Sequence, residues 1–152
     1  MCLIVDTNCF GCFFDKANQE FSPARDWVLN KEGKLMCGGT KYLEEMKKAG
    51  KYMKLILELN KRGKVIQLDN SVVDGEENRI KSIEANPDFD DPHLIAMTIV
   101  GRCQIICTQD KRAAKFLKKK ELYPKDVKRP KLYTGKNCKN LLCKKYIAKK
   151  YL

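Results

Sequence analysis

Acidic side chains occur at four places in the sequence where they could hold a metal ion. Asp6 and Asp110 each follow a short hydrophobic segment, Asp91 opens another one, and Glu44 and Glu45 stand side by side. Carboxylates that converge on one crevice repel one another unless a cation neutralises them. Mg²⁺ and Mn²⁺ prefer such oxygen ligands, and two ions of this kind can clamp a phosphodiester. The pattern therefore predicts a hydrolytic site for Mg²⁺ or Mn²⁺.

Each of these residues also has a purely structural interpretation when it is taken alone. An Asp at the end of a strand often caps the next turn or helix. Asp88, Asp90 and Asp91 can together form a solvated turn that caps a helix, and Glu44 and Glu45 suit an exposed helix face. Only the joint pattern favours a metal site over these alternatives.

Short apolar runs predict the strands that position the carboxylates. These strands cover residues 3–5, 64–69, 103–108 and, as a final edge strand, 131–134. Asp6 and Asp110 then lie at or just past the carboxyl ends of strands, where ligands bind in open parallel sheets. Residues 18–37 are interpreted as irregular, with a helix start or a turn at Ser22-Pro23.

Helical spacing of apolar residues separates the predicted strands. One helix is expected after Gly38-Gly39 with Thr40 as its cap, and others at 51–62, 74–85, 91–101 and 111–120. A basic amphipathic helix is expected from Lys139 onward, with Leu141, Leu142, Tyr146 and Ile147 on one side. Strands that alternate with helices indicate an α/β fold around a mostly parallel sheet.

The net charge of +12 indicates a polyanionic partner. The alternative is a lysine-rich surface that only keeps the protein in solution. Much of the basic excess follows Lys111, and such clustering favours a surface or arm that contacts a nucleic-acid backbone. We therefore expect nucleic acid as the partner.

Neither a membrane span nor a secretory signal is expected from the sequence. No segment approaches the roughly 20 apolar residues that a span requires, and the amino terminus lacks a basic leading region. The eight cysteines are therefore expected to stay reduced in a cytoplasmic setting. A zinc site built from Cys9, Cys12, Cys138 and Cys143 is a weaker alternative, because their spacing matches no common zinc module.

Three segments carry a resemblance to the PIN-domain family of nucleases. They are IVDTN (4–8), DDPHLIAMT (90–98) and ICTQD (106–110). The ordered set is similar to the motifs of that family, which includes ribonuclease toxins and RNA-processing enzymes. The resemblance covers the chain to about Tyr133, so it implies a PIN-like domain at 1–134 and a basic, helical extension at 135–152. It also implies a three-layer α/β/α fold with a central sheet of four or five strands.

The resemblance implies metal ligands at Asp6, Glu45, Asp91 and Asp110. Glu45 is preferred to Glu44 because an apolar residue follows it, and Asp91 to Asp90 because of the small residue seven positions later. Many relatives carry a further acid two residues after the last Asp. Here Arg112 stands at that position, so chemistry with one metal remains open.

Several polar residues are predicted to hold substrate next to the metal. Asn8 and Thr108 match polar positions of the family motifs. Four basic residues lie close in sequence to the proposed ligands, namely Lys41, Lys111, Arg112 and Lys115. His93, the one histidine, has three interpretations: a general base, a contact to a ligand or to substrate phosphate, or a plain surface histidine.

The resulting hypothesis is a metal-dependent nuclease, with RNA favoured over DNA because of the family analogy. One rival is a nucleic-acid-binding module that keeps the fold without catalysis. Another is a toxin-like protein controlled by a small protein partner at the Leu141, Tyr146 and Ile147 face. A third is a phosphomonoesterase with the same carboxylates. Pairing of two copies is also expected from the family.

Overall fold

A single parallel sheet organises the chain. The structure is a computed structural model that describes residues 2–146. In these residues five strands pair in the order β3-β2-β1-β4-β5, and every neighbouring pair is parallel. The strands are β1 (Cys2–Val5), β2 (Lys34–Cys37), β3 (Val65–Gln67), β4 (Ile105–Cys107) and β5 (Lys131–Tyr133).

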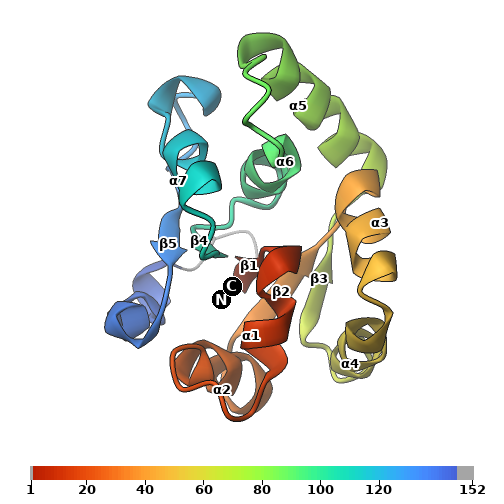
Figure 1. The fold of residues 1–152 in the computed structure, drawn as a ribbon, viewed down its shortest axis with the longest axis vertical. Coiled ribbons are helices and arrows are strands. Elements are labelled where there is room, and N and C mark those ends of the chain that lie inside the picture. The colour runs from red at the N-terminus through yellow and green to blue at the C-terminus, as the bar shows by residue number, and fades with distance from the viewer. Residues whose placement is uncertain (1, 147–152) are drawn as a thin grey trace.

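Helices cover both faces of this sheet. Figure 1 shows α5 and α6 on one side of the strands and α1 and α2 on the other. The α-helices are α1 (Phe10–Phe14), α2 (Ser22–Asn30), α3 (Thr40–Lys48), α4 (Gly50–Lys61), α5 (Asn70–Ile83), α6 (Pro92–Gly101) and α7 (Lys111–Leu117). The predicted α/β fold with three layers is therefore confirmed. Among the helices of residues 2–146, none has the length and apolar character that a bilayer crossing needs.

Burial distinguishes the central strands from the edge strands. All residues of β1 and β4 are buried, as expected for strands covered by helices on both faces. The edge strands β3 and β5 are partly exposed, and β5 confirms the predicted final edge strand. The apolar runs before Asp6 and Asp110 therefore predicted the two fully buried strands, β1 and β4.

The strand order reverses between β1 and β4. The chain moves outward from β1 to β2 and β3, returns to the other side of β1 as β4, and continues outward to β5. In open parallel sheets, ligands bind outside the carboxyl ends of the strands at such a reversal. Asp6 directly follows β1, while Thr108 and Asp110 follow β4. The topology thus places the predicted carboxylates at a favourable position for a ligand.

The interpretation of residues 18–37 as irregular is wrong, because α2 and β2 lie there. Helix α2 starts with Pro23 in its first turn and buries Ala24, Trp27 and Val28. Strand β2 has only three buried residues after an exposed lysine, which is a weak sequence signal. It becomes a strand because β1 and β3 both pair with it.

The basic tail also differs from its prediction. In place of one amphipathic helix, the structure has short 3₁₀ helices at Lys136–Leu141 and Lys144–Tyr146. The first contacts β5 and α2. Leu141, Leu142 and Tyr146 are half-buried against the core, so this part of the predicted partner face is less exposed than expected. Ile147 lies outside the described residues.

A glycine turn fixes the start of α3, the helix that carries Glu45. Gly39 has φ +89°, and a Cβ there would lie 2.6 Å from Val73 Cγ1. The N–H of Gly39 donates to Asn70 Oδ1 at 2.9 Å, and the N–H of Thr40 donates to Asp74 Oδ1 at 2.8 Å. The prediction that Thr40 caps this helix is wrong, because side chains of α5 accept these hydrogen bonds instead.

Gly39→Ala should lower the free energy of unfolding by about 1–3 kcal/mol from backbone strain alone, and further through the contact with Val73. Gly75→Ala is the matched control, because Gly75 lies inside α5 with open space around its Cα. The control should stabilise the protein by about 0.5–1 kcal/mol, as alanine does in a helix. Urea unfolding of both variants measures the difference, and equal effects would contradict the role of the turn.

Candidate metal site

Asp6 is buried at the carboxyl end of β1, with 2% of its surface exposed. Its Oδ1 accepts the backbone N–H of Asn8 at 3.1 Å, and its Oδ2 accepts the Thr108 hydroxyl at 2.9 Å. Burial raises the pKa of Asp6, and these two hydrogen bonds only partly oppose it. A carboxylate held in this way would gain from a nearby cation.

Glu45 lies on α3 and is half-buried near the carboxyl end of β1, whereas its neighbour Glu44 is exposed. Its Oε2 accepts the Thr7 hydroxyl at 2.8 Å and lies 3.3 Å from His93 Nε2. Burial acts to raise the pKa of Glu45. The contacts with His93, Thr7 and Lys41 outweigh burial, so the pKa is lowered.

Helix α6 brings Asp91 into the interior. Asp91 stands at the amino end of this helix with 9% of its surface exposed, and its side chain makes no capping hydrogen bond. Burial, followed by the negative charge of Asp6, raises the pKa of Asp91 to about 6. Asp91 is therefore a poorly compensated carboxylate and not the solvated cap that its sequence context allowed.

His93 is also buried by α6, with 1% of its surface exposed. The interpretation as a plain surface histidine is therefore wrong. Its Nδ1 is a buried polar atom with no hydrogen-bond partner, which is rare in folded proteins. The sequence held a signal for this burial, because α6 is apolar on nearly all sides, as buried helices are.

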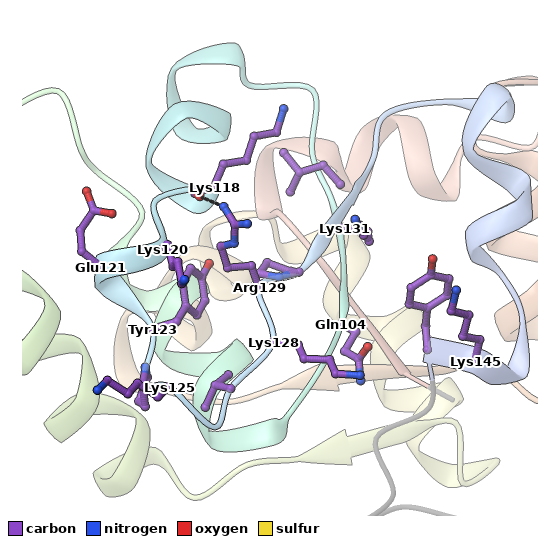
Figure 2. Close-up of a pocket in the computed structure, with 15 residues that line it drawn as sticks. Gln104, Lys118, Lys120, Glu121, Tyr123, Lys125, Lys128, Arg129, Lys131 and Lys145 are labelled. Atoms are coloured by element: carbon purple, nitrogen blue, oxygen red, sulfur yellow. Dashed lines mark hydrogen bonds between the residues drawn. The ribbon is translucent and has the colours of Figure 1, made fainter.

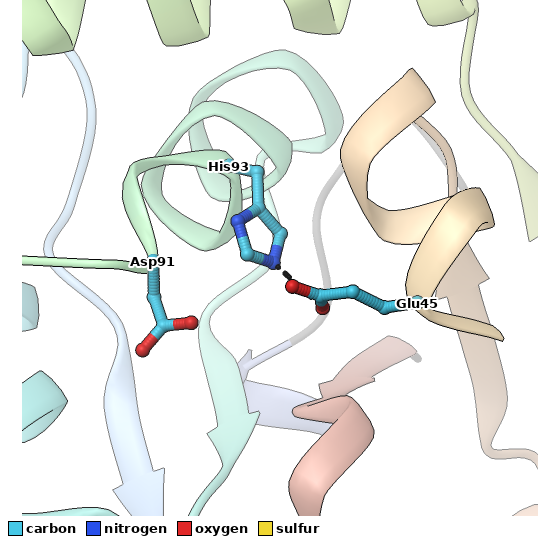
Figure 3. Close-up of side chains that lie close together, drawn as sticks. All are labelled: Glu45, Asp91 and His93. Atoms are coloured by element: carbon cyan, nitrogen blue, oxygen red, sulfur yellow. Dashed lines mark ion pairs between the residues drawn. The ribbon is translucent and has the colours of Figure 1, made fainter. Parts of the chain in front are cut away.

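Glu45, Asp91 and His93 together could hold a metal ion. One ligand atom from each residue lies within 4.8 Å of the other two. Figure 3 shows the two carboxylates and the imidazole facing a common space, with Glu45 paired to His93. Carboxylate oxygen and imidazole nitrogen are both ordinary ligands of divalent cations.

Asp6 and Asp110 lie outside this group of three. Asp110 caps α7, since its Oδ1 accepts the N–H of Arg112 at 2.8 Å and of Ala113 at 3.3 Å. Both carboxylates are nevertheless near enough to raise the pKa of Asp91. The group of three thus contains two of the four predicted carboxylates, together with a histidine that was not among the predicted metal ligands.

Thr108 links two of the carboxylate residues. It is 1% exposed, donates its hydroxyl to Asp6, and accepts the backbone N–H of Asp110 at 3.1 Å. Its predicted contact with substrate stays a prediction; in the structure its hydroxyl holds Asp6 and Asp110 in place. The other predicted substrate residues have exposed side chains: Asn8, Lys41, Lys111, Arg112 and Lys115.

The cysteines do not form the alternative zinc site. Among residues 2–146, no group of three metal-ligating side chains includes a cysteine. Burial, followed by the charge of Asp6, raises the pKa of Cys9 to about 12, which keeps it a thiol at neutral pH. In the metal-free protein Cys9 is therefore a buried, unreactive thiol.

Thr108→Val should weaken metal binding by removing the hydroxyl that positions Asp6 and Asp110. The matched control is Thr98→Val, which removes a buried hydroxyl that bonds only to Leu94 O within α6. Contacts that orient metal ligands are worth about 10–100-fold in affinity, and because Asp6 and Asp110 lie beside the proposed ligands, we expect a loss near the lower end, about 10-fold. The metal-dependent rise in melting temperature reports this affinity. Equal losses in both variants would contradict the positioning role of Thr108.

The site combines a candidate cation-binding group, surrounding negative charge and exposed basic residues. Such an arrangement can bind a divalent cation and attract a phosphate ester to it. Comparisons of the chain with protein-family models, curated proteins and solved structures gave no match. The residues of the chain and the geometry and charge of the site are therefore what indicate its function.

Proposed function

We propose that the chain is a metal-dependent nuclease that hydrolyses phosphodiester bonds in RNA. The observation that carries this proposal is the Glu45, Asp91 and His93 group at the strand-order reversal, with the pKa of Asp91 raised to about 6. Perturbed carboxylates that converge at a ligand-binding position favour a functional role over a structural one. The resemblance of the strand-end motifs to those of PIN-domain nucleases supports the same reaction.

In this proposal Glu45, Asp91 and His93 hold the ion, while Asp6 and Asp110 add negative charge beside it. A divalent cation bound there supplies Lewis acidity for attack on the phosphodiester. The exposed Lys41 and Lys111 lie close in sequence to these residues and would hold the substrate backbone.

We propose Mn²⁺ as the better cofactor, with Mg²⁺ as the weaker one. Mg²⁺ favours oxygen ligands, whereas imidazole favours transition metals. His93 belongs to the candidate group together with two carboxylates. The mixed ligand set therefore suits Mn²⁺, which also accepts carboxylate ligands.

End-labelled single-stranded RNA incubated with Mn²⁺ or Mg²⁺ tests this function. We expect cleavage by the native protein, none in EDTA, and a loss of at least about 100-fold in Asp91→Asn. Asp90→Asn is the matched control, because Asp90 is exposed next to the site and should keep full activity. Equal cleavage by the native protein and Asp91→Asn would place the activity elsewhere or in a contaminant.

A second candidate is a nucleic-acid-binding module without catalysis. Arg112 favours it, because its guanidinium Nε lies 3.9 Å from Asp110 at the position where many PIN-domain relatives carry an acid. A binding module should bind RNA equally well in EDTA and after Asp91→Asn, without cleavage in any metal. That combination of results would replace the nuclease proposal.

A further inference from the structure

A groove of about 1080 Å³ lies beside the amino ends of β4 and β5, whereas the candidate metal site lies beside the carboxyl ends of the strands. Gln104, directly before β4, and Lys131, the first residue of β5, both line it. Because all five strands are parallel, their amino ends lie at one end of the sheet and their carboxyl ends, with the metal site, at the opposite end. The groove is therefore a surface separate from the candidate metal site.

Positive charge dominates this groove. Seven of its lining residues are cations and one, Glu121, is an acid. Figure 2 shows Lys120 and Lys125 at one end of the groove and Lys145 at the other. Between these ends lie Lys118, Lys128, Arg129 and Lys131.

Within the described residues, none of these seven cations forms an ion pair with a carboxylate. The adjacent Lys119, by contrast, pairs with Glu84, outside the groove. Arg129 Nη1 donates to Lys118 O at 2.8 Å, which anchors the guanidinium at the groove wall. Uncompensated like charges gathered in a concave surface repel one another and focus a positive potential, which attracts a polyanion.

Helix α7 connects the groove to the metal site. Its N-cap residue Asp110 lies beside the site, and its C-cap residue Lys118 lines the groove. The exposed Lys111, Lys115 and Lys118 follow one another at spacings of four and three residues, so they share one face of the helix. This stripe spans about 10 Å at the helical rise of 1.5 Å per residue.

We propose that the groove binds the phosphate backbone of a single-stranded nucleic acid and that α7 leads this strand to the metal site. A concave, elongated surface fits a chain of phosphates better than it fits a flat membrane. The path along α7 rests on the proposed nuclease function, whereas binding in the groove does not. The groove residues would then position the strand without reading its sequence.

The test compares two triple variants of the full chain in EDTA. The groove variant replaces Lys120, Lys125 and Lys128 by Gln. The control replaces the exposed Lys47, Lys48 and Lys54 of α3 and α4 by Gln, so both variants lose three of the net +12 charges. Fluorescence anisotropy with a short labelled RNA, and with DNA of the same sequence, gives affinity at several salt concentrations.

The groove variant should bind both oligonucleotides more weakly, and its slope of log K against log salt should be shallower by about 2. The control should keep the slope of the native protein. Equal loss in both variants would overturn the proposal in favour of overall charge, as would native binding by the groove variant. Groove-dependent binding to phosphatidylserine vesicles without binding to oligonucleotides would also overturn it. RNA cleavage in Mn²⁺ is measured in a separate assay. Absence of cleavage would contradict the proposed nuclease function but would not affect the interpretation of the binding measurements.

Discussion

Asp91→Asn should make the metal-free protein more stable at neutral pH while it removes metal binding. The native Asp91 carboxylate is buried near the negative charges of Asp6, Glu45 and Asp110, and it makes no capping hydrogen bond. Asparagine has nearly the same shape but carries no charge, so the substitution removes this repulsion and the cost of burying a charge. A shift of the Asp91 pKa from 3.8 to about 6 corresponds to about 3 kcal/mol.

The pH dependence of stability provides an independent check on this prediction. The raised pKa means that, between about pH 4 and 6, the folded state keeps a proton on Asp91 that the unfolded state has lost. Stability of the metal-free native protein should therefore fall as the pH rises through this window, with the full penalty present above about pH 6. Asp91→Asn should lose this part of the pH dependence.

Thermal unfolding in EDTA and in Mn²⁺ measures both effects. Mn²⁺ should raise the melting temperature of the native protein and leave that of Asp91→Asn nearly unchanged, because a ligand stabilises only the state that binds it. The exposed Asp90→Asn should resemble the native protein in both conditions. If Asp91→Asn is less stable than the native protein in EDTA, the Asp91 carboxylate stabilises the fold. It would then not be a metal ligand whose burial lowers the stability of the metal-free protein.

The sequence predicted best the features that depend on local patterns. The apolar run before Asp6 is fully buried as β1, and the run before Asp110 contains the buried β4. The parallel pairing of these strands follows from the alternation of strands and helices. The sequence alone is therefore enough to predict two carboxylate residues at the carboxyl edge of the sheet.

Features that depend on tertiary contacts were harder to predict. β2 has few apolar residues, and its identity as a central strand depends on partners from distant parts of the chain. The Glu45 and His93 contact joins α3 to α6, and no sequence spacing encodes it. The basic groove likewise brings the α7 end, the loop before β5 and Lys145 together only through folding.

His93→Gln should change which metal the site prefers. Glutamine lacks the imidazole nitrogen but offers an amide oxygen, so the ligand set becomes harder and less suited to transition metals. We expect the affinity for Mn²⁺ to fall about 10–100-fold, by analogy with supporting metal contacts, and the affinity for Mg²⁺ to change less. The ratio of the two affinities should therefore move toward Mg²⁺.

This ratio separates a metal ligand from a purely structural histidine. His93 Nε2 lies 3.3 Å from Glu45 Oε2, and a structural ion pair alone would explain that contact. If His93 only holds Glu45 in place, His93→Gln should weaken Mn²⁺ and Mg²⁺ binding equally and lower the melting temperature in EDTA. The unpartnered Nδ1 argues against a histidine whose bonds are satisfied by packing alone. Titration calorimetry with each metal distinguishes the two cases, because only a ligand role changes the Mn²⁺ to Mg²⁺ ratio.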